Sequence, residues 1–141
     1  MVETAKIQSM TEAAATILVV EDSPTQAMHV QTLLEREGVN VVLAADGPEG
    51  LSLARRVLPD LVLLDMQLPG MNGLQVCSEL KQAPSTAEIP VILFTRHDDP
   101  QMITMGLQSG VVDYIPKDAF ADAVLLETLR QMGLIPCRAE E

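Results

Sequence analysis

The most restrictive feature of this sequence is an uninterrupted aliphatic run, Leu61–Leu64, that leads directly into Asp65. A short, continuous apolar run is typical of a strand covered on both faces, as in a parallel sheet between two layers of helices. The turn-forming residues Leu68-Pro69-Gly70 follow almost at once. Asp65 is therefore predicted to stand where a buried strand reaches the surface.

Aliphatic and amphipathic segments alternate along the rest of the chain. The predicted strands are 16–20, 39–44, 60–65, 89–95 and 111–116. The predicted helices begin at Ser23-Pro24, at Gly47-Pro48, near Asn72, at Asp99-Pro100 and at about Asp118, and the first, third and fifth end at Gly38, before Pro84 and at Met132. Strict alternation of strands and helices predicts an α/β fold with a parallel sheet and helices on both faces.

The helical period also predicts which side chains face the sheet. Ser23, Gly47 and Asp99, each before a proline, are the expected N-caps of three helices. The residues expected to point inward are Ala27, Val30, Leu33, Leu34, Leu51, Ala54, Leu58, Leu74, Cys77, Leu80, Ile103, Leu107, Val124, Leu125 and Leu129. One domain is expected over 16–133, between a flexible leader at 1–15 and a C-terminal tail at 134–141.

Composition excludes several classes of protein. A hydrophobic share of 48% excludes disorder, while a net charge of −11 repels phosphate backbones and argues against direct nucleic-acid binding. We find no apolar segment long enough to cross a membrane and no signal-peptide core, so a cytoplasmic location is expected. Cys77 and Cys137 lie in no metal-binding motif and are not expected to form a disulfide.

The predicted strands deliver a reactive set of groups to one edge of the sheet. In parallel sheets ligands gather at the carboxyl ends of the strands. The residues expected there are Glu21, Asp22, Asp65, Thr95, Tyr114 and Lys117. Two carboxylates at 4 Å repel by about 4 kcal/mol at an effective dielectric of 20, so at least one of the three is expected to have a raised pKa. Mg²⁺ prefers oxygen ligands and would relieve such repulsion. With the metal held at this edge, Asp65 can act as a carboxylate nucleophile toward phosphorus.

Four segments, TILVVEDSP, LVLLDMQLPGMNG, VILFT and DYIPKDAF, together resemble the receiver domain of two-component response regulators. The resemblance covers about 16–133 and implies a doubly wound, flavodoxin-like sheet of strand order 2-1-3-4-5. It also implies the role of each residue in the site. Asp65 accepts a phosphoryl group from a sensor histidine kinase or a histidine phosphotransfer protein. Mg²⁺ is held by Asp22, Asp65 and the Gln67 backbone carbonyl, with Glu21 acting through water. Thr95 is the switch hydroxyl, Tyr114 the switch aromatic residue and Lys117 the phosphate-binding lysine.

Two positions depart from the family pattern. Arg96 and His97 follow Thr95, where receivers usually have a small residue first, and this puts phosphoryl exchange rates in doubt. Asp118 follows Lys117 in place of the usual proline, which removes the usual reason for a cis peptide bond there and leaves the direction of Lys117 open.

The resulting hypothesis is a phosphorylation-controlled binding switch rather than an enzyme with a foreign substrate. Its output surface is expected to comprise the helix that follows Pro100, strand 111–116 and helix 118–132, its output partner is unknown, and a monomer or weak homodimer is expected. Two alternatives stay open. One is a Mg²⁺-dependent phosphatase, although Gln67 stands where such enzymes usually place a second acid. The other is a degenerate receiver that binds partners without being phosphorylated.

Overall fold

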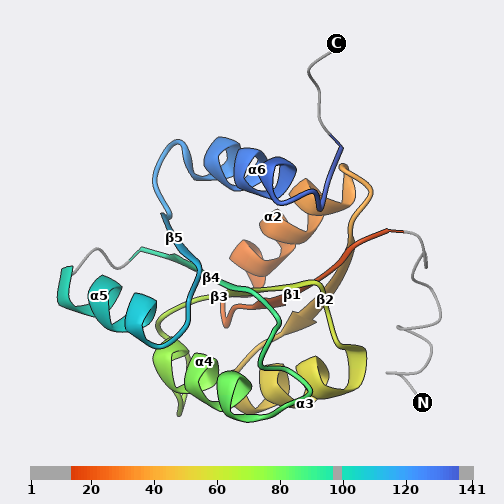
Figure 1. The fold of residues 1–141 in the computed structure, drawn as a ribbon. Coiled ribbons are helices and arrows are strands. Elements are labelled where there is room, and N and C mark those ends of the chain that lie inside the picture. The colour runs from red at the N-terminus through yellow and green to blue at the C-terminus, as the bar shows by residue number, and fades with distance from the viewer. Residues whose placement is uncertain (1–13, 97–99, 137–141) are drawn as a thin grey trace.

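The computed structural model describes residues 14–96 and 100–136 (Figure 1). His97, the expected cap Asp99, Cys137, residues 1–13 of the predicted leader and residues 137–141 of the tail lie outside this range. Along the described chain the elements are β1 (Thr16–Val20), α2 (Pro24–Glu35), β2 (Asn40–Ala44), α3 (Gly47–Val57), β3 (Leu61–Leu64), α4 (Gly73–Gln82), β4 (Val91–Thr95), α5 (Pro100–Gln108), β5 (Asp113–Pro116) and α6 (Ala121–Gln131).

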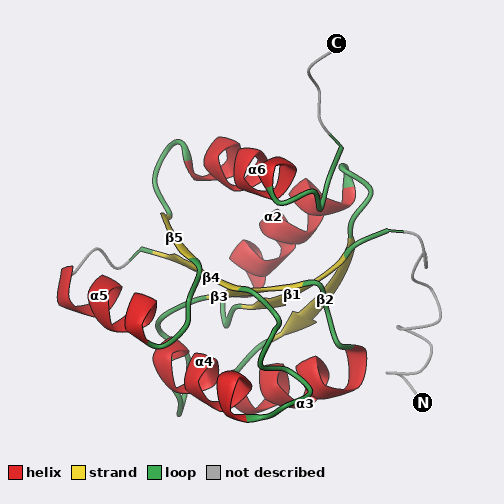
Figure 2. Ribbon diagram, viewed as in Figure 1, coloured by secondary structure: helices red, strands yellow, loops and turns green. Residues whose placement is uncertain are grey.

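The strands form one parallel sheet in the order β2-β1-β3-β4-β5, which confirms the predicted order. Figure 2 shows α2 and α6 on one face of the sheet and α3, α4 and α5 on the other. The central strand β3 pairs with β1 through Leu64↔Val20 and with β4 through Leu64↔Leu93. This register brings the carboxyl ends of the three strands to the same edge.

Burial of β3 on both faces follows from its sequence. Leu61 and Leu63 pack in the core under α2 and α6, whereas Val62 and Leu64 pack in the core under α3 and α4. All four side chains are at most 1% exposed, and each contributes about 1.5–3 kcal/mol by leaving water. A polar residue in β3 would therefore disrupt one of the two cores.

Side-chain caps fix where three of the helices begin. Ser23 accepts the Gln26 N–H at the start of α2, as predicted. Asn72 and Gln75 form a reciprocal capping box at the start of α4. The prediction for α3 was wrong by one residue, because the cap is Asp46 rather than Gly47. Glycine has no side chain to accept a hydrogen bond, whereas Asp46 Oδ1 accepts the Glu49 N–H at 2.8 Å.

Leu58 was wrongly predicted to face the core. It is 53% exposed and adopts a left-handed conformation (φ 50°) as the C-cap of α3, so it no longer follows the helical stripe. Leu51 and Ala54 are buried as predicted, and Leu53 joins them.

Leu107 and Val124 were also wrongly assigned to the core, since they are 52% and 44% exposed. Among the positions of α5 whose burial is described, Gly106 is the buried one, and an added Cβ there would lie 2.8 Å from Leu93 Cδ1. The helix therefore approaches the sheet through its backbone. In α6 the buried residues are Ala121, Leu125 and Leu129, which form the stripe without Val124.

The predicted strands 39–44, 60–65, 89–95 and 111–116 begin one or two residues before the observed ones. The predicted fifth helix likewise begins too early, because the N–H of Phe120 is bound by Asp118 Oδ1 in a turn that precedes α6.

At the amino end of β4, Lys81 of α4 donates from Nζ to the carbonyls of Ala87 (3.1 Å) and Ile89 (2.7 Å) and so holds the segment that leads into this strand. No helix within 14–96 and 100–136 has both the length and the apolar character that a bilayer crossing requires.

Candidate functional site

Asp65 is held rigidly at the carboxyl end of β3. Its N–H donates to the Val20 carbonyl at 3.1 Å, which continues the ladder between β1 and β3 by one residue. The chain then folds back, and the Gly73 N–H donates to the Met66 carbonyl at 2.7 Å. A Cβ on Gly73 would lie 2.6 Å from the Asp65 carbonyl oxygen, so only glycine permits this close turn. The backbone around Asp65 is therefore fixed before any ligand binds.

Three carboxylates meet at this edge. Glu21, Asp22 and Asp65 each offer an oxygen atom, and these atoms lie within 4.8 Å of one another. Glu21 is buried, Asp65 is partly buried and Asp22 is exposed. The donor set consists of oxygen atoms alone, which suits a hard divalent cation such as Mg²⁺, and the exposed Asp22 leaves a route from solvent.

Lys117 lies at the centre of the acidic group. Its Nζ donates to Glu21 Oε1, to Asp65 Oδ2 (3.0 Å) and to Gln26 Oε1 (2.6 Å), and it lies 5.5 Å from the centre of the Phe94 ring. The Lys117 N–H donates to the Thr95 carbonyl at 2.9 Å, which fixes the end of β5 against β4. Among the described residues no peptide bond is cis, yet Lys117 still reaches Asp65 without a following proline.

Thr95 and Gln67 bind the other oxygen of Asp65. The fully buried Thr95 donates its hydroxyl to Asp65 Oδ1 at 2.9 Å, and the Gln67 N–H donates to the same atom at 3.2 Å. Tyr114 is partly buried and packs against the core that lies under α3 and α4. The structure thus gathers Glu21, Asp22, Asp65, Gln67, Thr95 and Lys117 around one point, with Tyr114 on the neighbouring strand.

Glu21 and Asp65 have opposite pKa shifts. Burial raises the pKa of Glu21 above its ordinary value, against the lowering effect of its hydrogen bonds to Lys117 and the Ser23 N–H, and the charge of Asp65 adds only a smaller part. The expectation of one raised pKa is confirmed, although its main cause is loss of water rather than repulsion. Burial also acts to raise the pKa of Asp65, but the positive charge and hydrogen bond of Lys117, with smaller contributions from Glu21 and Thr95, outweigh burial and lower it.

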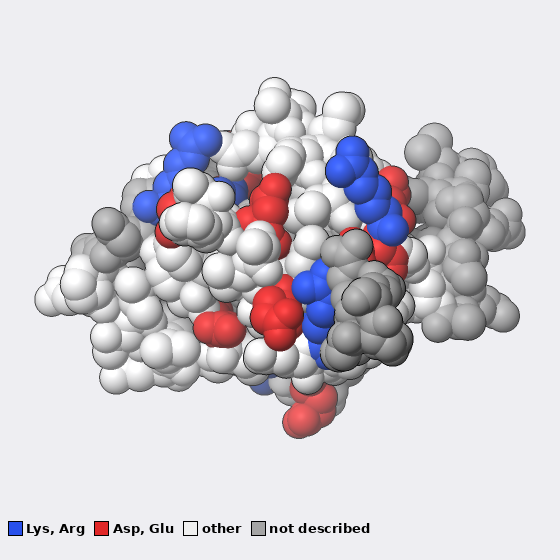
Figure 3. Space-filling model, turned by 90° about the horizontal axis from the view of Figure 1, so that it is seen from above, with Lys and Arg blue, Asp and Glu red and all other residues white. Residues whose placement is uncertain are grey.

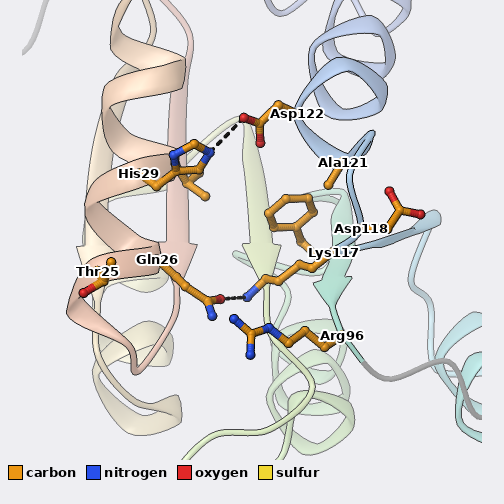
Figure 4. Close-up of a pocket in the computed structure, with 10 residues that line it drawn as sticks. Thr25, Gln26, His29, Arg96, Lys117, Asp118, Ala121 and Asp122 are labelled. Atoms are coloured by element: carbon orange, nitrogen blue, oxygen red, sulfur yellow. Dashed lines mark hydrogen bonds and ion pairs between the residues drawn. The ribbon is translucent and has the colours of Figure 1, made fainter.

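Two neighbouring cavities, which share two lining residues, open at the site. A cavity of about 190 Å³ contains Asp65 and is lined by Glu21, Asp22, Ser23, Gln26, Gln67 and Arg96. A second cavity of about 340 Å³ lies between α2 and α6 and shares Gln26 and Arg96 with the first (Figure 4). At its far end, His29 Nε2 lies 2.8 Å from Asp122 Oδ2. Sequence reasoning missed Gln26, His29 and Asp122, because nothing in a lone polar residue on a helix shows which distant segment it will meet.

The charge distribution around this region is mixed. Figure 3 views the side that α2 and α6 cover, where basic and acidic side chains are interspersed and the described basic residues form separate small groups. Such a face does not resemble the continuous basic surface that binds phosphate backbones.

Comparison with known proteins places these residues in a family pattern. The family model of the response regulator receiver domain matches residues 17–130. Protein PilH of Pseudomonas aeruginosa is 38% identical over 111 residues, which is 79% of this chain and 92% of that protein. Response regulator PleD of Caulobacter vibrioides is 40% identical over 119 residues, 84% of this chain but only 26% of PleD.

A solved structure extends the comparison to the metal. The receiver domain of sensor histidine kinase PA1611 from Pseudomonas aeruginosa has a magnesium ion coordinated in its active-site cleft. It superimposes with a TM-score of 0.76 and 30% identity over 84% of this chain and 96% of that chain.

Asp22→Asn is expected to raise the melting temperature of metal-free protein by a few degrees and to reduce its further rise with Mg²⁺. Lys117 Nζ binds Glu21, Asp65 and Gln26 but not Asp22, so removing the charge of Asp22 relieves repulsion while it replaces one carboxylate ligand with a neutral amide. For the wild type, Mg²⁺ at one hundred times its dissociation constant stabilises by about 2.7 kcal/mol. Thermal unfolding in chelator and in Mg²⁺ measures both effects, with the exposed Glu88→Gln as a charge-matched control. An unchanged Mg²⁺ response in Asp22→Asn contradicts the metal assignment.

Glu21→Gln and Asp65→Asn are expected to change the pH dependence of stability in opposite directions in chelator. Because the folded pKa of Glu21 is raised, its contribution is present below about pH 4.3 and is lost as pH rises through the folded pKa. Because the folded pKa of Asp65 is lowered, its contribution is present above about pH 3.9 and is lost as pH falls through the folded pKa.

The advantage of wild type over Glu21→Gln should therefore shrink as pH rises above about 4.3, and its advantage over Asp65→Asn should shrink as pH falls below about 3.9. Urea unfolding at a series of pH values measures both differences. Parallel curves for the two variants are inconsistent with Lys117 favouring the Asp65 carboxylate over that of Glu21.

Proposed function

The chain belongs to the receiver domain family of response regulators, and we propose on that basis that it is a phosphorylation-controlled signalling switch with Asp65 as its phosphoryl acceptor. One observation carries the proposal. Thr95 and Lys117 bind separate oxygens of the Asp65 carboxylate, at the point where Glu21 and Asp22 add the remaining acidic ligands. An aspartate with a purely structural role at a strand end needs neither the bonds to its two separate oxygens nor the neighbouring carboxylates.

The proposed reaction transfers a phosphoryl group from a phosphohistidine of a sensor kinase or phosphotransfer protein. A carboxylate oxygen of Asp65 forms a bond to phosphorus, the bond between phosphorus and the donor imidazole nitrogen breaks, and the imidazole retains that electron pair and takes up a proton. The lowered pKa of Asp65 keeps its carboxylate ionised and therefore nucleophilic at neutral pH. Lys117 and Thr95 already lie within hydrogen-bonding distance of this carboxylate and would bind the phosphoryl oxygens.

The residues present fit Mg²⁺. Asp22, Asp65 and the Gln67 carbonyl would hold it directly, and Glu21 would act through water. When bound, Mg²⁺ neutralises the carboxylates and orients phosphoryl oxygens. Because Lys117 already contacts Glu21 and Asp65, the exposed Asp22 is the carboxylate that most depends on the added charge.

The proposed switch runs from Asp65 through Thr95 to Tyr114. When the Thr95 hydroxyl turns to a phosphoryl oxygen it gives up its bond to Asp65 Oδ1, and β4 and β5 shift together because Leu93 pairs with Tyr114 and Thr95 with Pro116. The output surface would then be α5, β5 and α6. The binding-competent conformation must gain about 5.5 kcal/mol to move from 1:99 to 99:1.

Partners and context belong to the same proposal. The chain spans about a quarter of PleD, so the activity, kinase and output partner of PleD are not transferred to this chain. Its own activity within a larger protein, its kinase and its output partner are proposals. We expect a cytoplasmic monomer or weak homodimer with no direct nucleic-acid contact, consistent with the net charge of −11. A receiver domain from 16–133 between a leader and a tail remains the proposed domain organisation.

A phosphorylation-independent binding module is the second candidate, and Arg96 is the observation in its favour. This long cationic side chain lines the cavity that contains Asp65, where it would restrict the approach of a phosphodonor. Such a module would bind its partner equally well with and without a phosphodonor and would gain no phosphate.

Asp65→Asn is expected to abolish phosphorylation, because an amide is not a nucleophile toward phosphorus. Incubation with acetyl phosphate and Mg²⁺ followed by intact mass should show one added phosphate on the wild type and none on the variant. Asp60→Asn, at the opposite end of β3, is the matched control and should gain one phosphate, since its new amide oxygen can still accept the Thr16 N–H. A wild type without added phosphate would favour the binding module.

Thr95→Ala is expected to gain phosphate but to lose the response of Tyr114. The sequence has one tyrosine and no tryptophan, so intrinsic fluorescence reports Tyr114 alone. Acetyl phosphate with Mg²⁺ should change this fluorescence in the wild type, and the variant should show a matching mass gain with little change in emission. Equal fluorescence changes in two fully phosphorylated proteins would reject the coupling through Thr95.

A further inference from the structure

Phosphorylation of Asp65 changes the net charge of the site. Glu21, Asp22 and Asp65 carry three negative charges in the cavity, and Lys117 supplies one positive charge through its bonds to two of them. One divalent cation completes neutrality. Phosphorylation replaces the single charge of the Asp65 carboxylate with a phosphoryl group of about two negative charges, so one further positive charge is then required.

Arg96 is placed to supply that charge. It directly follows Thr95, whose hydroxyl binds Asp65, and it lines both the Asp65 cavity and the adjoining cavity between α2 and α6. Figure 4 shows its guanidinium directed toward the hydrogen bond between Gln26 and Lys117. Within the described part of the chain Arg96 makes no hydrogen bond or ion pair, although three carboxylates lie around the cavity that it lines.

This lack of a partner distinguishes Arg96 from Lys117. The lysine is committed to Glu21, Asp65 and Gln26 before any phosphate arrives. The arginine is exposed and uncommitted, and its planar guanidinium suits two parallel hydrogen bonds to phosphoryl oxygens.

We propose that Arg96 is a second phosphoryl-binding cation. In the resting protein it makes no hydrogen bond or ion pair with Asp65, and it binds the phosphoryl group once that group is attached to Asp65. The inference rests on the proposed function of Asp65. Arg96 holds the phosphorylated state by neutralising its added charge and by covering the open side of the cavity against water.

The consequence is a longer-lived acyl phosphate. In hydrolysis an oxygen of water forms a bond to phosphorus, the bond between phosphorus and the Asp65 oxygen breaks, and Asp65 regains its carboxylate as inorganic phosphate and a proton are released. A guanidinium bound to the phosphoryl oxygens stabilises the state before this step and occupies the space through which water approaches.

Two measurements on the full chain test the proposal. The first is the affinity for beryllofluoride in the presence of Mg²⁺, followed by fluorine NMR, because this anion mimics a phosphoryl group on a carboxylate without needing phosphoryl transfer. The second is the lifetime of phosphate on Asp65, followed by intact mass after acetyl phosphate is removed. The variants are Arg96→Ala, Arg96→Lys and, as a control, Arg55→Ala, which removes an exposed arginine from the last turn of α3.

Loss of one charge-assisted bond predicts roughly tenfold weaker beryllofluoride binding and a roughly threefold to tenfold shorter phosphate lifetime in Arg96→Ala. Arg96→Lys should recover part of both losses, because it keeps the charge without the planar fork, and Arg55→Ala should match the wild type. Unchanged affinity, an unchanged or longer lifetime in Arg96→Ala, or an equal effect of Arg55→Ala would overturn the proposal.

The same data separate this inference from the proposed function. If the wild type gains no phosphate but binds beryllofluoride in an Arg96-dependent way, phosphoryl transfer fails and the Arg96 site stands. If the wild type is phosphorylated and Arg96→Ala behaves identically, the switch stands and the Arg96 site fails. If the wild type neither gains phosphate nor binds beryllofluoride, both are rejected.

Discussion

The complete burial of β3 is the constraint on which the rest of the structure depends. Four aliphatic side chains alternate between two cores, so helices must cover both faces of the sheet, and only the two ends of the strand reach solvent. The strand cannot move without opening both cores. Asp65, one residue beyond it, therefore has a backbone position set by these four buried side chains and by the Val20 carbonyl rather than by any ligand.

The ammonium group of Lys117 joins the ends of three strands. It contacts Glu21 after β1 and Asp65 after β3, while its own backbone continues β5. Removing one partner of a buried ion pair costs about 3–5 kcal/mol, so this contact contributes to stability as well as to chemistry. In the proposed reaction a phosphoryl group would compete with the carboxylates for the same cation, and the resting contacts of Lys117 would set the free energy that this competition has to overcome.

The parallel sheet and the acidic group were predictable because they depend on patterns within single segments, whereas the strand order followed from the resemblance to receiver domains. The run Leu61–Leu64 and the residues that follow each strand place Asp65, Thr95 and Lys117 at one edge through the geometry of parallel sheets alone. The errors have a different origin. Leu58, Leu107 and Val124 fit a helical stripe but are exposed: Leu58 is a left-handed cap, α5 approaches the sheet at Gly106, and the buried stripe of α6 excludes Val124. These depend on tertiary packing, as does the contact of Gln26 with Lys117, which spans 91 positions in sequence.

The hydrogen bonds that Lys81 donates to the carbonyls of Ala87 and Ile89 determine which end of β4 can move. They anchor the segment before β4 to α4, so this strand is restrained at its amino end, while its carboxyl end carries Thr95. A displacement that starts at Thr95 would then be opposed along the axis of β4 and would pass to β5, which is joined to β4 by the Thr95↔Pro116 pairing and by the Lys117 N–H. In the proposed switch the amino end of β4 would therefore stay in place while its carboxyl end moves together with β5.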